Sequence, residues 1–565
     1  MNRRLLSCWR SDAAGRRCGV NCWQWLSRTA LAWILVFPYV VIAASGGSLP
    51  ELTREGLRAL FVAGHSNPIP LESLYVPGRL KVLYAQRGYE PLWIGPDGPR
   101  AEVAILIEEA QDARREGLAA EYHLTDIQGL MQRGELEGEN ATRLELLLSD
   151  AFLKLATDRY QGRFSPSDVD PQWQLEQPSL QPERLMIKSL EQGRLRETLD
   201  SLAPNHPRYL AMRSALEGLW RIAEEGGWPA LPAGPSLEAG DRDARVVLLR
   251  ERLHISGDLQ IPPRDSEDLF DAGLASAVRF FQTRHGLEVD GIVGPHTRAA
   301  LNVPVEKRID QLIINLERWY WLPRELGPRH ILVNMAGFEL ELFEEGHPPL
   351  WMRAIVGKTY RQTPTFSGRL TYLVVNPTWT IPARILKLDI APRLNSNPDY
   401  LAQQRIRIFD GWKADADEIG LEQVDWSRVG RRYTHYRFRQ EPGPANALGR
   451  IKFMLQNPYD IYLHDTPRRE LFKEAVRTFS SGCIRLEKPV ELAQRLLAMG
   501  GADAGQLEQS LESGKTRNLG LQKAVPVYFV YMTAWVDGQG VLQFRKDVYK
   551  RNKVMEATLF ESRGG

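Results

Sequence analysis

The sequence predicts a multidomain α+β protein, and three observations lead to this fold class. The length of 565 residues exceeds a single hydrophobic core and favours about three or four domains. Apolar residues recur at helical spacing through the first 225 residues, whereas alternating runs typical of strands begin near residue 330. We therefore expect a helical N-terminal domain, a small three-helix domain and a mainly-β domain that carries an inserted lid.

The composition is that of a folded protein without a strong charge bias. Hydrophobic residues make up 43% of the chain and charged residues 25%, which indicates a globular rather than a disordered protein. The 72 lysines and arginines nearly cancel the 70 aspartates and glutamates, and no tract is typical of an RNA- or DNA-binding module. The sequence therefore predicts no nucleic-acid partner.

Residues 1–44 are predicted to direct export and to lie outside the fold. Six arginines precede an apolar run of 16 residues that ends in small side chains. This order is typical of a secretory signal peptide. The run is shorter than the roughly 20 residues of a spanning helix, but the long basic region also fits an inner-membrane anchor. Both alternatives place the rest of the chain in the periplasm, with or without inner-membrane association.

Cysteine usage singles out one thiol. Three of the four cysteines, Cys8, Cys18 and Cys22, lie in the export segment, so the rest of the chain contains only Cys483. Exported proteins normally pair their cysteines, and a single leftover indicates a reactive thiol. The alternative is a buried, inert cysteine that packs as a small hydrophobe.

Residues 50–225 are expected to form a helical scaffold domain. Apolar residues repeat at helical spacing over 103–110 and 144–155, and these helices are predicted to end near Gly117 and Gly162. No motif in this region carries recognisable chemistry.

Residues 242–303 follow a Pro/Gly-rich linker and are predicted to form a three-helix unit. Pro295 fits the first turn of the third helix. The string AVRFFQTRHGLEVDGIVGPHTRAALN, with its DG-x-x-G-x-x-T core, resembles the peptidoglycan-binding-like domain of cell-wall hydrolases. The resemblance implies cell-wall glycan as a partner, while a generic helical spacer and a module that docks on its neighbour stay open as alternatives.

Alternating apolar residues predict a mainly-β domain over residues 328–550. The predicted strands cover 330–334, 338–342, 351–356, 370–375, 451–455, 461–463, 527–535 and 541–544. The Asp537-Gly538-Gln539-Gly540 stretch between the last two strands is a hairpin signal. Over 383–444 the alternation lapses into a polar, Arg-rich segment, which predicts an inserted lid or, alternatively, a solvated decoration.

Two short motifs in the β region supply the candidate chemistry. The strand at 461–463 delivers His464, and Cys483 follows in a tight turn that contains Gly482. An imidazole that reaches a thiol produces a thiolate nucleophile, as covalent acyl transfer requires. The sequence shows no paired histidine ligands and no Gly-rich phosphate loop, so we expect neither a metal nor a cofactor.

The motifs HDTP and SSGCIRLE, with GPANALGRIKFML and VVNPTWTIP before them, resemble the L,D-transpeptidase catalytic domain of bacterial cell-wall enzymes. The order of domains resembles the large periplasmic members of that family. The resemblance implies that Cys483 is the nucleophile and that His464 either takes its proton or holds a thiolate–imidazolium pair with it. A backbone carbonyl near Asp465 would orient the histidine, with the Asp465 carboxylate as the alternative. Backbone N–H groups of Cys483 and Gly482 would form the oxyanion hole.

Five further residues receive roles through the same resemblance. Ser481 stands two positions before the cysteine, where many members have histidine. Arg485 either faces substrate carboxylates or ties the turn to the sheet. Trp379 either packs on the substrate or covers the core. Asn446, in the NALG stretch, is expected mainly to support the structure, and Tyr462 is a candidate substrate contact.

The implied substrate is a peptidoglycan tetrapeptide stem, as both donor and acceptor. Cys483 would form a thioester with the third residue, typically meso-diaminopimelate, and release the terminal D-Ala. Attack by the side-chain amine of a second stem would give a 3→3 cross-link, and carbapenems would acylate the same thiol. The alternatives are an L,D-carboxypeptidase that uses water, a non-catalytic wall-binding scaffold and a cysteine peptidase that acts on proteins.

Overall fold

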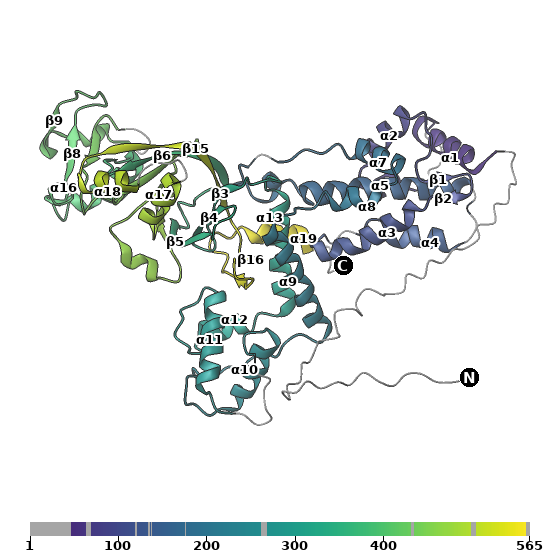
Figure 1. Ribbon diagram of the computed structural model, residues 1–565, viewed down its shortest axis with the longest axis horizontal. Coiled ribbons are helices and arrows are strands. Elements are labelled where there is room, and N and C mark those ends of the chain that lie inside the picture. Colours follow the sequence, from purple (N-terminus) through teal and green to yellow (C-terminus); the bar gives the residue numbers. More distant parts are fainter. Residues whose placement is uncertain are drawn as a thin grey trace, which may run out of the picture.

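The computed structural model describes residues 47–560 except 64–68, 119–120, 134–135, 137, 176, 261–267, 431–433 and 499–503. The predicted export segment therefore lies outside the described residues. Within the described residues, no helix is long and apolar enough to cross a membrane. Figure 1 shows a helical N-terminal region, a small helical domain and a β-rich C-terminal region, so the predicted fold class is confirmed.

The N-terminal region is built from helices that surround one central helix. Its main helices are α1 (Leu49–Arg58), α2 (Pro77–Gln86), α3 (Glu102–Asp112), α4 (Leu124–Gln132), α5 (Gly138–Gln161), α7 (Pro182–Glu191), α8 (Leu195–Asp200) and α9 (Pro207–Glu224). Helix α5 is buried on nearly all sides. Its Arg159 is buried and paired with Glu109 at 2.7 Å and with Glu116 at 3.0 Å, which offsets the desolvation of the guanidinium.

The three-helix domain consists of α10 (Ala244–Ile255), α11 (Ala272–Arg284) and α12 (Pro295–Leu301) around its own core. The buried Gln282 side chain explains its sequence motif. Its amide group donates to Asp290 Oδ1 at 2.7 Å and to Thr297 Oγ1 at 3.2 Å, and it accepts the N–H of Gly291 at 2.9 Å. Three residues of the motif therefore hold the turn between α11 and α12.

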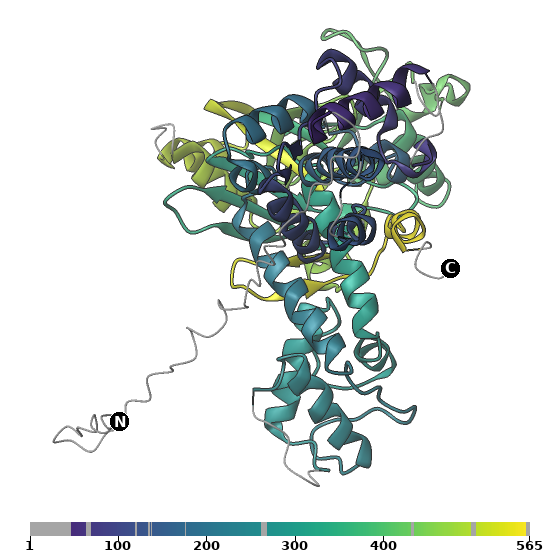
Figure 2. The same cartoon turned by 90° about the vertical axis from the view of Figure 1, so that its right-hand side faces the viewer.

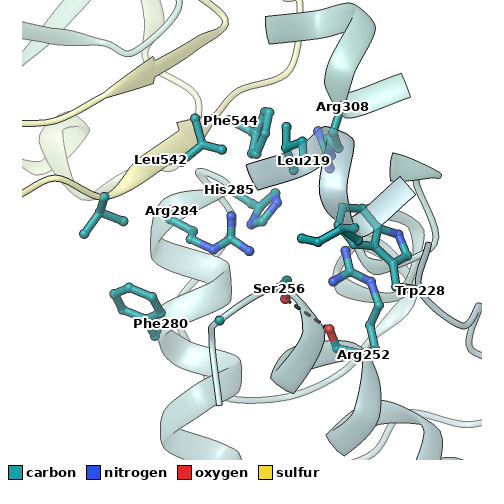
Figure 3. Close-up of a pocket in the computed structure, with 13 residues that line it drawn as sticks. Leu219, Trp228, Arg252, Ser256, Phe280, Arg284, His285, Arg308, Leu542 and Phe544 are labelled. Atoms are coloured by element: carbon teal, nitrogen blue, oxygen red, sulfur yellow. Dashed lines mark hydrogen bonds between the residues drawn. The ribbon is translucent and has the colours of Figure 1, made fainter. Parts of the chain in front are cut away.

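Helix α13 (Val305–Tyr320) and α9 run side by side and carry the three-helix domain, as Figure 2 shows from a second direction. Figure 3 shows the junction at which the three-helix domain meets α9, α13 and residues 541–544 of the β-rich region, around a cavity of about 220 Å³. There Arg252 stacks on Trp228 at 3.8 Å, and His285 stacks on Phe281 at 3.8 Å and on Phe544 at 5.5 Å. Of these contacts, the one between His285 and Phe544 joins the three-helix domain to the β-rich region.

The β-rich region, which contains the predicted catalytic residues, forms a sheet with the strand order β13-β5-β14-β12-β11-β6-β15-β3-β4. Because β4 also pairs with β5, the sheet closes on itself around one apolar core. Its strands are β3 (Arg329–Asn334), β4 (Glu339–Glu344), β5 (Leu350–Gly357), β6 (Phe366–Val375), β11 (Ile451–Gln456), β12 (Leu463–His464), β13 (Thr478–Ser480), β14 (Ile484–Leu486) and β15 (Arg517–Val530). Helices α17 (Pro489–Ala498) and α18 (Ala504–Glu512) follow β14.

The segment predicted as a lid at 383–444 folds into a small unit with its own sheet and core. Its sheet has the order β7-β10-β8-β9, formed by β7 (Trp379–Thr380), β10 (Arg437–Gln440), β8 (Ile406–Phe409) and β9 (Glu418–Ile419). Ile381, Ile408 and Phe438 belong to a separate apolar cluster. The alternative of a solvated decoration does not fit this buried core. We refer to residues 379–440 as the insertion.

The predicted hairpin at the C-terminal end is present but leaves the closed sheet. Within the described residues, β16 (Ala534–Val536) and β17 (Leu542–Phe544) pair only with each other, so the predicted strand over 527–535 is split. The break occurs because Thr533 turns to α13, where its N–H donates to Asn315 Oδ1 at 2.8 Å. Helix α19 (Asn552–Phe560) also packs on α13.

Candidate active site

Two parallel neighbouring strands bring the predicted catalytic residues together. Strand β12 pairs with β14 in the register Leu463 to Ile484 and His464 to Arg485. Side chains alternate between the faces of a sheet, so Tyr462, His464, Cys483 and Arg485 share one face. All four line a cavity of about 1070 Å³ whose opposite wall is the insertion.

His464 is buried and held in one tautomer. Its Nδ1 lies 2.5 Å from the backbone carbonyl of Asp465, the contact that the resemblance implies. A carbonyl oxygen only accepts, so Nδ1 carries the hydrogen and Nε2 keeps its lone pair. Burial, with the positive charges of Arg485 and Lys452, lowers the pKa of His464 to about 3. The imidazole is therefore a neutral base at neutral pH.

The Asp465 carboxylate is used elsewhere. Its Oδ2 accepts the N–H of Arg450 at 2.9 Å, and its Oδ1 lies 3.2 Å from the Arg469 guanidinium. Gly449, at φ +61°, makes room for it, because a Cβ there would lie 2.4 Å from Asp465 Cγ. The Asp465 carboxylate therefore stabilises the turn at Gly449 and Arg450, while the backbone carbonyl of Asp465 contacts His464.

The Cys483 thiol is half-buried and faces the cavity. Its Sγ lies 3.8 Å from the carbonyl oxygen of Asp460. Burial raises the pKa of Cys483, and the N–H and hydroxyl of Tyr462 and the Lys452 ammonium oppose this rise. Among the described residues, no hydrogen bond joins Cys483 to His464. The resting pair is therefore a thiol and a neutral imidazole.

The turn before the nucleophile has one engaged N–H group and one open N–H group. Gly482 adopts φ +126°, its N–H donates to Ser480 Oγ at 3.1 Å, and its carbonyl accepts from Thr363 Oγ1 at 2.8 Å. The backbone N–H of Cys483 has no acceptor within the described part of the chain. Of the two predicted oxyanion donors, the Cys483 N–H is the free one.

Ser481 connects the nucleophile turn to the insertion. Its Oγ accepts from Arg361 Nη1 at 2.9 Å, and the same nitrogen lies 2.5 Å from Asp389 Oδ2. Asp389 belongs to the helical segment Leu386–Ile390 of the insertion. Sequence reasoning missed Arg361 and Asp389, because neither stands in a motif. At position 481, where the resemblance leads us to expect a histidine, this chain has a serine whose hydroxyl is bonded to the Arg361–Asp389 ion pair.

An aromatic and cationic group completes the floor of the cavity. Lys452 Nζ lies 3.8 Å from the centre of the Tyr462 ring, which packs edge-on to His464 at 5.7 Å. Trp379 is half-buried, packs on the core of the insertion and lines the cavity. Lys452 was also missed, although the alternation in Ile451-Lys452-Phe453 could have placed it on the same face as His464.

Arg485 and Asn446 differ in what they contact. Arg485 lines the cavity, and within the described residues it has no hydrogen bond or ion pair; its Nε is buried without a partner. This favours the alternative in which Arg485 faces a substrate carboxylate. Asn446 is 1% exposed and donates to the carbonyls of Pro377 and Glu441, each at 3.0 Å. It therefore joins the two ends of the insertion and lies outside the cavity lining.

The cavity is strongly basic. Its lining lysines, arginines and acidic residues are seven cations and two anions: Lys358, Arg361, Arg384, Arg393, Lys452, Arg468, Arg485, Asp389 and Asp460. A cleft lined by one sign of charge concentrates ligands of the opposite sign. The site therefore suits a ligand with several carboxylates.

Comparisons with known families cover three parts of the chain. Residues 328–517 match an L,D-transpeptidase catalytic domain, and residues 242–301 match a family described as "Putative peptidoglycan binding domain". Residues 78–216 match a scaffold domain.

Two curated proteins show similarity over part of their length. A Haemophilus influenzae protein named "Putative L,D-transpeptidase" is 34% identical over 219 residues, which is 39% of this chain and 44% of that protein. An N-acetylmuramoyl-L-alanine amidase of Mycobacterium tuberculosis is 42% identical over 80 residues, which is 13% of this chain and 20% of the amidase. The chain thus spans less than half the length of these curated relatives.

A solved L,D-transpeptidase from Mycobacterium smegmatis aligns with 36% of this chain and 58% of its own length, at 9% identity and a TM-score of 0.17. One from Xylanimonas cellulosilytica aligns with 53% of this chain and 99% of its own length, at 15% identity and a TM-score of 0.16. The domain matches therefore show that residues 328–517 of this chain are similar to the L,D-transpeptidase catalytic domain, and that residues 242–301 are similar to the peptidoglycan-binding domain family.

Proposed function

We propose that the protein is a periplasmic peptidoglycan L,D-transpeptidase that forms 3→3 cross-links through a Cys483 thioester. The observation that carries this proposal is the placement of Cys483 and His464 on one face of adjacent parallel strands, at the floor of a basic cavity. A stem peptide carries several carboxylates, so it is the cell-wall component that complements this charge. Arg485, a cation without a protein partner, is the proposed contact for one of these carboxylates.

The first half-reaction acylates the thiol. His464 Nε2 takes the Cys483 proton as Sγ attacks the carbonyl carbon of the third stem residue. The carbonyl oxygen becomes an oxyanion and accepts the Cys483 N–H. The carbon–nitrogen bond to the terminal D-Ala then breaks, and the imidazolium returns its proton to the departing amine. The product is a thioester, and His464 is neutral again.

The second half-reaction transfers the acyl group to an amine. The side-chain amine of a second stem attacks the thioester carbonyl and gives a proton to His464. The carbon–sulfur bond breaks, and the imidazolium re-protonates the leaving thiolate. The cavity of about 1070 Å³ lies at the upper end of the range of ordinary ligand pockets, roughly 300–1,000 Å³, and we propose that it takes the second stem beside the acyl chain. In the carboxypeptidase alternative, water is the acceptor.

The product pattern tests the proposal. Purified exported chain is incubated with tetrapeptide-rich peptidoglycan, which is then digested to muropeptides and analysed by mass spectrometry. We expect 3→3 dimers that are absent with Cys483→Ala. Tripeptides without dimers would show that the protein is a carboxypeptidase and not a transpeptidase. Unchanged muropeptides with the wild-type protein would favour the non-catalytic wall-binding scaffold.

A further inference from the structure

A second large cavity lies where three parts of the molecule meet. It has a volume of about 990 Å³ and is lined by the three-helix domain over 283–289, by strands β4 and β5 and by the β16–β17 hairpin. None of its lining residues lines the catalytic cavity. At the neighbouring junction, the ring contact of His285 with Phe544 joins the three-helix domain to the β-rich region beside this cavity (Figure 3). We call it the junction cleft.

The charge of the junction cleft is balanced. Its ionisable lining residues are five cations and five anions: Arg208, Arg353, Lys473, Arg477, Arg545, Glu288, Glu339, Glu341, Glu474 and Asp537. The catalytic cavity, by contrast, has seven cations and two anions. A stem peptide or another polyanion gains no net attraction from a balanced cleft. The junction cleft therefore suits an uncharged polar ligand.

An exposed aromatic side chain offers an apolar platform in this polar cleft. Trp351 on β5 is 48% exposed, and its Nε1 donates to Glu339 Oε2 at 3.0 Å. The hydrogen bond fixes the indole, so a ligand that stacks on it loses little side-chain freedom. Val289, which is 50% exposed, adds apolar surface from the three-helix domain.

The polar groups around the indole are also held in place. Arg353 Nε donates to Glu487 Oε1 at 2.9 Å, and Arg545 donates to the Arg284 carbonyl at 2.9 Å and to Gln543 Oε1 at 3.1 Å. A pyranose ring has an apolar C–H face and a rim of hydroxyl groups. The aromatic face of the indole matches the first, and the fixed polar groups around it match the second.

We propose that the junction cleft binds the glycan strand of the cell wall, as an uncharged chain of N-acetylated sugars that stacks on Trp351. The proposal rests on the proposed function, because it supplies the polymer on which the stems are presented. Strand β5 joins the two cavities, with Trp351 at one end and Lys358 just past the other. Trp351 and Lys358 are seven residue steps apart, a distance of about 23 Å along an extended chain, so glycan bound at Trp351 is held near the catalytic cavity.

Titration calorimetry with a tetramer of β-1,4-linked N-acetylglucosamine tests the cleft on the full exported chain. We expect binding by the wild type, about tenfold weaker binding by Trp351→Ala, and partial retention by Trp351→Phe. Trp426→Ala is the matched control, because Trp426 is 38% exposed in the insertion and lines neither cavity. Cys483→Ala should bind the sugar as the wild type does.

Carbapenem acylation of the same preparations separates this inference from the proposed function. Trp351→Ala should still be acylated, which also shows that it is folded. Equal sugar affinity for Trp351→Ala and wild type would overturn the inference, as would Trp351-dependent binding of a free tetrapeptide stem in place of the sugar. If the wild type binds the sugar through Trp351 but is never acylated, the proposed function fails and the glycan cleft stands.

Discussion

His464 is neutral because burial and two cations act on it together. Its ring is buried at the wall of the cavity, and Arg485 and Lys452 oppose a further positive charge, so its pKa falls to about 3. The Asp465 carbonyl fixes the hydrogen on Nδ1. A lowered pKa means that the proton-accepting form persists well below the ordinary histidine pKa of about 6.5. The base is therefore available across the acidic range.

The pH dependence of acylation follows from this. We expect the rate constant for carbapenem acylation to show no decline near pH 6.5, because His464 stays neutral down to its pKa of about 3. In Lys452→Gln one repelling charge is absent, so the acid limb moves upward by about half a unit to one unit. Stopped-flow rates after pH jumps to between about pH 2.5 and pH 8 measure both profiles. A wild-type limb centred near 6.5 would contradict the buried neutral base.

Gly449 allows a test of the brace behind the histidine. Gly449→Ala should lower the free energy of unfolding by about 3 kcal/mol, because a Cβ at φ +61° would overlap the Asp465 carboxylate. Gly514→Ala is the matched control: its φ is +63°, and nothing lies within 4 Å of the added Cβ. Backbone strain alone should make the control lose about 1 kcal/mol in urea unfolding. Equal losses would show that the carboxylate moves aside freely.

At the level of elements, the sequence predicted the strands better than their arrangement. Alternation located β3, β5, β6 and β11, because each has one face on the core. The pairing of β12 with β14 depends on contacts between distant segments, which periodicity does not report. The motifs therefore predicted Cys483 and His464, while the shared face with Lys452 required the register.

The insertion shows the opposite limit of sequence reasoning. Its strands are two to four residues long, and its apolar residues stand among arginines such as Arg407 and Arg437. Such short strands give no sustained alternation, so the segment was predicted only as a lid. The contact of Asp389 with Arg361 depends on the folded insertion, and no local signal marks it.

The insertion is expected to set the position of the nucleophile turn through this contact. Asp389→Asn removes the charge that holds Arg361 against Ser481, so we expect acylation efficiency to fall by about tenfold. Asp415→Asn, an exposed position in the same insertion, should leave the rate unchanged. Steady-state kinetics with a chromogenic β-lactam compares the two variants. Equal acylation rates for the two variants would show that the insertion does not set the position of the nucleophile turn.

On the scale of the whole molecule, α13 connects all three regions. Its Glu317 accepts the N–H of Arg163 at 2.6 Å from the helical region, and its Asn315 bonds Thr533 beside the closed sheet. Its Arg308 lies at the junction with the three-helix domain. The helical region meets the sheet again at His206, whose ring faces His330 at 6.2 Å.

This second contact predicts acid sensitivity. Burial, His330 and Arg208 lower the pKa of His206 in the folded protein to about 4. As the pH falls below about 6.5, His206 therefore becomes protonated in the unfolded chain before it does so in the folded protein. Stability is therefore lost between about pH 6.5 and pH 4. His206→Asn keeps a cap for α9 and should reduce that loss by about 2 kcal/mol in urea titrations at each pH. An identical loss in the variant would place the acid sensitivity elsewhere.

The acyl-enzyme tests the central claim most directly. Incubation of the purified exported chain with a carbapenem, followed by intact-mass and peptide mass spectrometry, should show one adduct of the whole drug mass on Cys483, because opening of the β-lactam ring releases no fragment. The adduct should be absent from Cys483→Ala and should form at least about a thousandfold more slowly with His464→Ala. A wild-type protein without an adduct, or an adduct that persists in Cys483→Ala, would contradict the account.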